Sequence, residues 1–297
     1  MSSRPFLKSL VGPVLFIAAG LFSLPASGVA QQDQVAPAKI PPLSAKPVLP
    51  LWEAGLFGFG LTQPAYPGSE ERVSRLLGLP FLIYRGKYLR AERGSVGLRA
   101  LKTPRTELDL GFAATLGSHS SDIAVRRGMT DLGTLIEFGP RLKINLGDLS
   151  SGRSHSRFQF PLREVIDVSN GFVSRGIAFE PQWIRNTRLP GRWFLSTELG
   201  MLFGDSKLAD TFYGVSPADA TPTRNSYSAR SGLFALRAGL FAAHALTPDV
   251  RLFSSFRVES LAGATNRDSP LVRRHVGWGA MIGISWTLAR SERPSEE

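Results

Sequence analysis

Histidine is the residue of this chain best suited to act as a general base or a metal ligand, and it occurs four times. His119 lies in residues 118–122 (SHSSD), where a serine, a histidine and an acid stand close in sequence; the others are His155, His244 and His275. A hydrolytic triad, however, is defined by residues that meet in space, and Ser and Asp are ordinary loop residues. No histidine has a second one at metal-ligand spacing. We therefore predict no catalytic, cofactor-binding or metal site.

Charged residues within alternating segments are more informative, because they share the polar side of their segments. Both signs are mixed among them, which leaves two interpretations open. One is an internal network of ion pairs that fills a narrow lumen, since ionised groups away from bulk water need partners. The other is a water-filled pore, where a ring of one sign would be expected to select ions. These residues are Glu107, Asp109, Glu137, Arg141, Lys143, Arg163, Glu180, Glu198, Arg237, Arg257 and Glu259.

The segments that position these charges have the two-residue period of β-strands. Residues 274–288 separate most clearly: Trp278, Ile282 and Trp286 belong to an apolar parity, and the alternate residues are small or polar. Residues 106–116, 132–145 and 192–203 repeat the pattern. An apolar face with aromatic residues near both ends, opposite a polar face, is typical of a strand that stands in lipid and lines a lumen. The pattern predicts an all-β fold, a transmembrane antiparallel up-and-down β-barrel.

Loop lengths predict the number of strands, because such barrels have short periplasmic turns and longer outer loops. Long connections at 62–75, 118–131, 206–228 and 262–273 alternate with short ones if 87–102 is a hairpin. Twelve strands result, and ten full strands with an irregular segment are the alternative. The twelve lie near 51–61, 76–84, 87–92, 95–102, 106–117, 132–146, 155–168, 172–186, 192–204, 229–245, 250–261 and 274–288.

The N-terminal part predicts export. Residues 1–30 combine Arg4 and Lys8 with an apolar run and small residues before Ala30, the layout of a cleaved signal peptide. A membrane-anchoring helix is the alternative, but the run is shorter than a span needs. Residues 31–50 contain five prolines and are expected to form an extended periplasmic lead-in. The barrel then occupies 51–288, and 289–297 is a polar C-terminal tail.

Composition restricts the partners. The chain has no cysteine, so a disulfide framework and thiolate metal sites are excluded. Its formal net charge is +11, which suits anionic lipid headgroups or polyanionic glycans. The charge alone would suit nucleic acid equally, but Arg and Lys are scattered singly and no nucleic-acid motif accompanies them.

Several short segments resemble one family. They are 55–60 (GLFGFG) leading to 64–69 (PAYPGS), 79–86 (LPFLIYRG), 212–216 (FYGVS), 268–272 (DSPLV) and 283–286 (GISW). In order and spacing they resemble the MltA-interacting protein (MipA)/OmpV family of Gram-negative outer-membrane proteins, over most of 51–288.

The resemblance implies a non-enzymatic barrel in the outer membrane. Members of the family are described as scaffolds that join a murein transglycosylase to a penicillin-binding synthase, and others as porin-like. We therefore expect outer-membrane lipid and these murein enzymes as partners, the enzymes on the periplasmic side, with no nucleic acid and no cofactor. The alternative function is a passive channel for small solutes.

Overall fold

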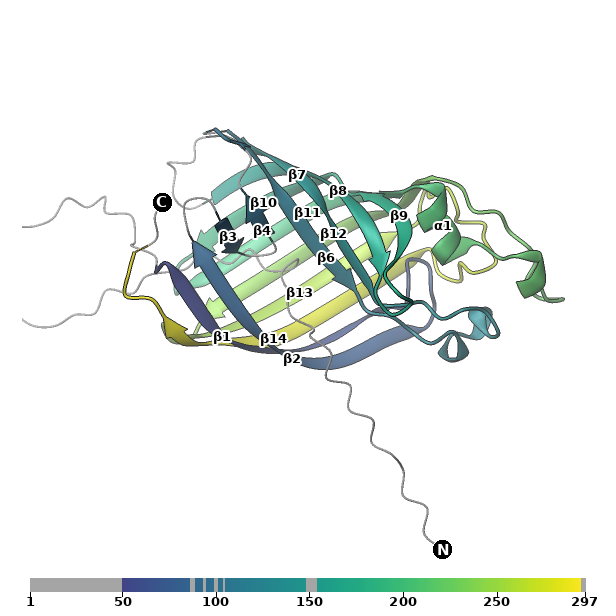
Figure 1. Ribbon diagram of the computed structural model, residues 1–297, viewed down its shortest axis with the longest axis horizontal. Helices are drawn as coiled ribbons and strands as arrows, with labels where there is room; N and C mark the ends of the chain where they lie inside the picture. Colours follow the sequence, from purple (N-terminus) through teal and green to yellow (C-terminus); the bar gives the residue numbers. More distant parts are fainter. Residues whose placement is uncertain are drawn as a thin grey trace, which may run out of the picture.

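The computed structural model describes residues 50–85, 89–92, 95–98, 101–103, 105–147 and 154–294. These residues form one antiparallel sheet of fourteen strands that curls into a barrel (Figure 1). The strands are β1 (Trp52–Pro64), β2 (Arg72–Arg85), β3 (Leu89–Glu92), β4 (Ser95–Leu98), β5 (Leu101–Lys102), β6 (Thr106–Thr115), β7 (Leu135–Leu146), β8 (Ser154–Asp167), β9 (Val173–Phe179), β10 (Gln182–Leu189), β11 (Trp193–Gly204), β12 (Gly232–Ala245), β13 (Val250–Ser260) and β14 (Val276–Arg290). The connections hold one α-helix, α1 (Ser206–Tyr213), and the 3-10 helices η2 (Ser120–Asp122), η3 (Ala124–Arg126) and η5 (Pro217–Asp219).

The first strand, β1, pairs with both β2 and the last strand, β14. From β14 the sheet continues through β13, β12, β11, β10, β8, β7 and β6 to β5, and on the other side of β1 it runs through β2 and β3 to β4. No ladder within the described part of the chain joins β4 to β5 or to β6, so the ring of hydrogen bonds is not closed there.

The predicted count of twelve strands is not confirmed. The segment predicted at 87–102 contains the short strands β3, β4 and β5, and the strand predicted at 172–186 is divided into β9 and β10. The interruption falls at Glu180 and Pro181, because proline has no N–H to give to a ladder. The carbonyl oxygen of Pro181 still accepts from the N–H of Met201, so the two halves follow the same neighbours.

The predicted register of the last strand is confirmed. Ile282 is 67% exposed, and Trp278 and Trp286 share its outward side, whereas Met281 and Thr287 are buried on the inside. β14 is longer than predicted and ends at Arg290. Beyond it the N–H of Ser291 donates to the carbonyl oxygen of Trp52 (2.9 Å), so part of the predicted tail pairs beside the first strand.

The long connections gather at one end of the barrel, with α1, and the short turns lie at the other (Figure 1). We call these the loop end and the turn end. The predicted connection at 62–75 is only residues 65–71, because β1 and β2 continue as a hairpin to Pro64 and Arg72. Among the described residues, no helix has the length and apolar character needed to cross a membrane.

Candidate functional site: the lumen and its two ends

A chain of ion-paired side chains lines the lumen. Arg163 on β8 bridges Glu137 on β7 (Nε to Oε2, 2.8 Å) and Glu180 (Nη2 to Oε2, 2.6 Å). Arg237 on β12 continues the chain, from Glu180 (2.6 Å) to Glu259 on β13 (3.5 Å). Alternation of the strands turns all of these side chains inward, as the sequence predicts.

The central carboxylate of this chain is satisfied on both oxygens. Glu180 is 5% exposed and accepts from Arg163 on one oxygen and from Arg237 on the other. Ionised groups taken out of water are tolerated when partners and geometry compensate for the lost hydration. The mixed signs of the luminal residues therefore form a network of ion pairs, as the first of the two sequence interpretations predicts.

A second charged group lies on β6 and β7. Asp109 is opposite Arg141 and Glu107 is opposite Lys143 in the antiparallel register. Arg141 donates to Asp109 with both Nε and Nη2 at 2.9 Å, and Lys143 Nζ lies 2.6 Å from Asp109 and 3.2 Å from Glu107. These pairs hold two neighbouring strands in one register.

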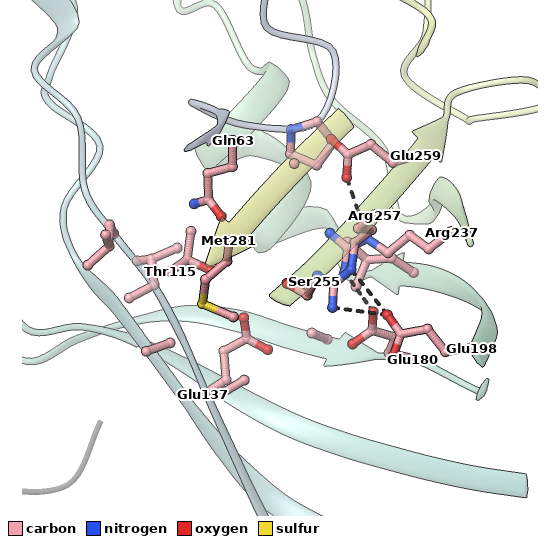
Figure 2. Close-up of a pocket in the computed structure, with 18 of the residues that line it drawn as sticks. Gln63, Thr115, Glu137, Glu180, Glu198, Arg237, Ser255, Arg257, Glu259 and Met281 are labelled. Carbon is pink, nitrogen blue, oxygen red and sulfur yellow. Dashed lines mark hydrogen bonds and ion pairs between the residues drawn. The ribbon is translucent and has the colours of Figure 1, made fainter. Parts of the chain in front are cut away.

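The lumen contains a cavity of about 580 Å³, within the usual size of small-molecule sites. In Figure 2, Arg237, Arg257 and three glutamates lie together on one side, and Thr115 and Met281 lie across from them. Arg257 pairs with Glu198 at 3.1 Å. The cavity is thus lined by both charged and apolar side chains.

Toward the turn end a cluster of apolar side chains faces the lumen, in contrast to the polar luminal face that is typical of such strands. Phe57 and Phe59 of β1 both face inward, with ring centroids 5.4 Å apart. They belong to a cluster that we call the turn-end cluster, in which each residue is only 4% to 9% exposed. The cluster consists of Phe57, Phe59, Phe194, Phe241, Ala243, Phe253 and Met281.

At the loop end, residues 65–71, 116–134, 205–231 and 261–275 pack on one another; we call them the loop cap. Their buried side chains join those of the barrel rim in one apolar cluster. Members from the loops are Ala65, Tyr66, Ile123, Leu132, Leu208, Ala209, Phe212, Tyr213, Val215 and Leu271, and members from the strands include Leu135, Val165, Ala178, Leu202 and Phe234.

Two buried arginines tie the loops of the cap together. Arg126 donates to the carbonyl oxygen of Phe212 (3.4 Å), and in return Arg224 donates to the carbonyl oxygens of Val125 (2.7 Å) and Arg127 (3.1 Å). Burial lowers the pKa of Arg126. Because each loop donates to the backbone of the other, neither can leave without exposing buried groups of both.

Tyrosine 66 connects the remaining two loops. Its hydroxyl donates to the carbonyl oxygen of Leu271 at 2.7 Å, and burial raises its pKa to about 12. Ser269 donates to the carbonyl oxygen of Tyr213 at 2.7 Å. The sequence does not reveal these contacts, because the first joins residues that are 205 positions apart and the second joins residues that are 56 positions apart.

The histidines are not assembled into a catalytic group. His119 Nδ1 lies 2.8 Å from Asp131 and not beside Asp122, and the hydroxyl of Ser120 donates to the carbonyl oxygen of Thr130. In the part of the chain that the structure describes, no serine hydroxyl is hydrogen-bonded to His119. The group at 118–122 therefore does not form the arrangement that its sequence suggests.

The other histidines have structural surroundings. His155 lies within β8, and its Nε2 is 3.1 Å from Asn186. His244 stacks on Trp193, with ring centroids 4.5 Å apart, and His275 precedes β14 and is exposed. Among the described residues, no three acidic or histidine side chains come together where they could hold a metal ion.

Strands with an apolar lipid face, aromatic residues near its ends, a polar lumen and loops at one end define an integral β-barrel protein of the outer membrane. The family model of the MltA-interacting protein MipA matches residues 57–288. The chain belongs to this family, and it is located in the outer membrane.

A curated relative bears the name "Putative outer membrane protein YiaT" in Escherichia coli (strain K12). It is 29% identical over 124 residues, which are 41% of this chain and 47% of the relative. The YiaT of Escherichia coli O157:H7 matches to the same extent. The chain thus spans about half the length of the curated relatives it matches.

Solved structures that are similar to this chain include two outer-membrane proteins. A NanC porin has a TM-score of 0.39 at 10% identity, over 78% of this chain and 100% of the porin. The outer membrane phospholipase A from Escherichia coli has a TM-score of 0.35 at 11% identity, over 78% of this chain and 92% of the phospholipase. Similarity at this level does not bear on function.

Proposed function

We propose that the protein is a non-enzymatic scaffold of the cell envelope that binds murein-cleaving and murein-synthesising enzymes through its turn end. The family's name describes an interaction with a murein transglycosylase. In outer-membrane barrels short turns face the periplasm, where such enzymes act on the cell wall.

The observation that carries this proposal is the packing of side chains toward both ends of the lumen. The loop cap packs as an apolar cluster over one end, and the inward aromatic side chains of the turn-end cluster lie toward the other. Ion pairs line one side of the wall between them. A lumen occupied by side chains in this way favours a role in presenting surfaces over a role in conducting solutes.

The turn end presents cationic side chains. Arg105, Arg188 and Arg192 are exposed there, at the turns between β5 and β6 and between β10 and β11. Such a surface favours an acidic partner and makes binding sensitive to salt. The lead-in at 31–49, residues 148–153 and residues 295–297 belong to the same proposed surface and lie outside the described residues.

Binding of the purified barrel to a lytic transglycosylase and to a bifunctional penicillin-binding synthase tests the proposal. The double variant Arg188→Gln, Arg192→Asn should weaken binding. Asparagine is chosen at position 192 because the φ of 63° there lies in the left-handed region, which asparagine adopts more readily than most residues. Arg267→Gln at the loop end is the matched control and should have no effect. If shortening residues 206–228 abolished binding while the turn variants did not change it, the scaffold would not act from the periplasmic side.

The second candidate is a passive channel for small solutes, which the 580 Å³ cavity favours. Single-channel recordings in planar bilayers separate the two functions. We expect no steady open steps from the wild-type protein. Long-lived open steps would contradict a purely scaffolding role.

A further inference from the structure

A cationic side chain, Arg185, lies on the lipid-facing side of β10. Its neighbours in the strand, Ile184 and Asn186, are buried, and Ile184 lines the luminal cavity. Because successive side chains of a strand point to opposite faces, Arg185 points away from the lumen. The residue is exposed there. A guanidinium group therefore stands on the outer surface of the barrel, among side chains that face lipid.

The depth of Arg185 in the membrane follows from the neighbouring strand, because Arg185 is directly opposite Thr197 of β11. The outward side of β11 runs from Trp193 at the turn end to Phe203 at the loop end. At ~3.4 Å per residue and a tilt of ~40°, this length spans about 26 Å, close to the ~25 Å height of the apolar band. Thr197 is four positions from Trp193, so Arg185 lies about 10 Å from the turn-end aromatic residues, within the hydrocarbon region.

Arg185 has no partner among the described residues. No hydrogen bond, ion pair or ring contact of its side chain occurs in that part of the chain. Arg290, which has the same outward orientation near the turn end of β14, instead pairs with Asp249. An ionised side chain at membrane depth is costly when it has no partner, and such residues usually mark functional sites. The partner of Arg185 is therefore expected to come from outside the described chain.

Hydroxyl groups lead from Arg185 toward the turn end. On β8, Ser156 is directly opposite Arg185 and shares its outward side. Two positions nearer the turn end, Ser154 Oγ and Thr187 Oγ1 lie 3.1 Å apart. β8, β10 and β11 are adjacent in the wall (Figure 1), so these residues and Thr197 form one continuous surface. We call Ser154, Ser156, Arg185, Thr187 and Thr197 the polar strip.

The chemistry of the polar strip suits a phosphate group. It consists of one guanidinium and four hydroxyl groups, with no carboxylate. A guanidinium binds phosphate through two parallel N–H donors, and hydroxyl groups can donate to the remaining oxygens. On a surface that faces lipid, phosphate is supplied by phospholipid headgroups. A headgroup of net negative charge matches an unpaired cation better than a zwitterionic one, which brings an ammonium group of its own.

We infer that the polar strip binds an anionic phospholipid of the periplasmic leaflet, whose phosphate group is drawn along Ser154, Ser156 and Thr187 toward the guanidinium of Arg185. The periplasmic leaflet is assigned because the strip lies in the turn-end half of the wall, and short turns face the periplasm. The long side chain of Arg185 can extend toward the headgroups and shorten the distance that the phosphate must move. This inference is independent of the scaffold proposed above, because it concerns the lipid face and not the turn-end surface.

Urea unfolding in vesicles tests the inference. The protein is folded in phosphatidylcholine alone and in phosphatidylcholine with phosphatidylglycerol, at equal ionic strength. Phosphatidylglycerol should raise the ratio of folded to unfolded wild type severalfold at a fixed urea concentration, and Arg185→Leu should lose this dependence. In phosphatidylcholine alone Arg185→Leu should be at least as stable as the wild type, because leucine suits the lipid face. Equal stabilisation of both proteins by phosphatidylglycerol would overturn the inference.

The matched control is Arg290→Leu. It makes the same substitution and removes the same charge on the lipid-facing side near the turn end, but from a cation that is paired with Asp249. Arg290→Leu should keep the response of the wild type to phosphatidylglycerol. If Arg290→Leu lost as much of the response as Arg185→Leu, the effect would be a general attraction of charge, and no site at Arg185 would be needed.

Native mass spectrometry identifies the bound lipid. Protein is released from vesicles that contain equal amounts of phosphatidylethanolamine and phosphatidylglycerol. We expect the wild type to retain one phosphatidylglycerol and Arg185→Leu to lose it. Retention of phosphatidylethanolamine in its place would contradict the assignment of a headgroup with net negative charge.

A second copy of the chain is the competing occupant of the polar strip. Because the chain has no cysteine, Thr197→Cys places a single thiol on the strip. Oxidation with copper phenanthroline in phosphatidylglycerol-containing vesicles should leave this variant monomeric. A disulfide-linked dimer that persists when the protein is diluted in lipid would show that protein, and not lipid, covers the strip.

Discussion

Replacing Ile282→Arg should strongly destabilise the barrel, because this side chain stands near the middle of the membrane. Trp278 and Trp286 lie four positions to either side on the same lipid-facing parity of β14. At ~3.4 Å per residue and a tilt of ~40°, Ile282 is about 10 Å from each tryptophan along the membrane normal. A cation at the midplane costs about 2–4 kcal/mol, and near the interface about 0–1 kcal/mol.

The matched control is Leu288→Arg, the same substitution on the same face but beyond Trp286. Urea titration of the proteins folded in phosphatidylcholine vesicles, followed by the shift of the unheated band, gives both free energies of unfolding. Gly279→Ser is a control for substitution on the luminal face of the same strand. A Cβ at position 279 would lie 3.5 Å from the nearest atom and fits there. Gly283 is not suitable, because a Cβ there would lie 2.6 Å from the carbonyl oxygen of Gly58. Equal losses for Ile282→Arg and Leu288→Arg would mean that the depth assigned to β14 is wrong.

Three further predictions concern the lumen and the loop cap. Arg163→Met should cost about 3–5 kcal/mol in the same titration, because Glu137 loses its ion-pair partner and the buried Glu180 loses one of its two partners. Arg257→Met, from a pair that is 35% and 27% exposed, should cost about 0–1 kcal/mol; equal losses would argue against a buried network. The hydrogen bond between His119 and Asp131 raises the pKa of His119 and lowers the pKa of Asp131. The contact should therefore weaken when the pH rises through the raised pKa of His119, because the imidazole loses its charge. It should also weaken when the pH falls through the lowered pKa of Asp131, because the carboxylate is protonated. NMR titration should show the pKa of His119 fall in Asp131→Asn, and an unchanged value would contradict the contact. Arg224→Ala should speed proteinase K cleavage within 205–231 without changing the band shift of the barrel; unchanged cleavage would show that the arginine does not hold the cap.

The sequence predicts the features that depend on strand period. Alternation accounts for the lipid-facing positions of Ile282 and Trp286, since a strand turns successive side chains to opposite faces. It accounts in the same way for the luminal positions of Glu137 and Arg163. Alternation also places Phe57 and Phe59 of β1 on the same face, but it does not say which way that face points. Their inward position depends on aromatic neighbours from other strands, which alternation within one segment does not reveal.

The loop cap could not be predicted from the sequence. α1 has only eight residues and depends on Asp205, whose side chain accepts from the N–H of Leu208 at its N-terminus. Gly176 of β9 has a φ of 112°, and a Cβ there would lie 2.8 Å from the N–H of Leu208, so the helix needs a glycine on a distant strand to pack. Such contacts are set by tertiary packing rather than by local pattern.

The loop cap also determines how the protein presents itself as an antigen. Its loops are joined through Arg126, Arg224 and Tyr66, so the surface that an antibody meets is assembled from segments far apart in sequence. The epitopes on this face are therefore conformational. Antisera raised against a linear peptide of residues 216–228 should recognise the denatured chain on a blot and bind intact cells poorly, whereas antibodies selected on the folded barrel should lose binding after heating.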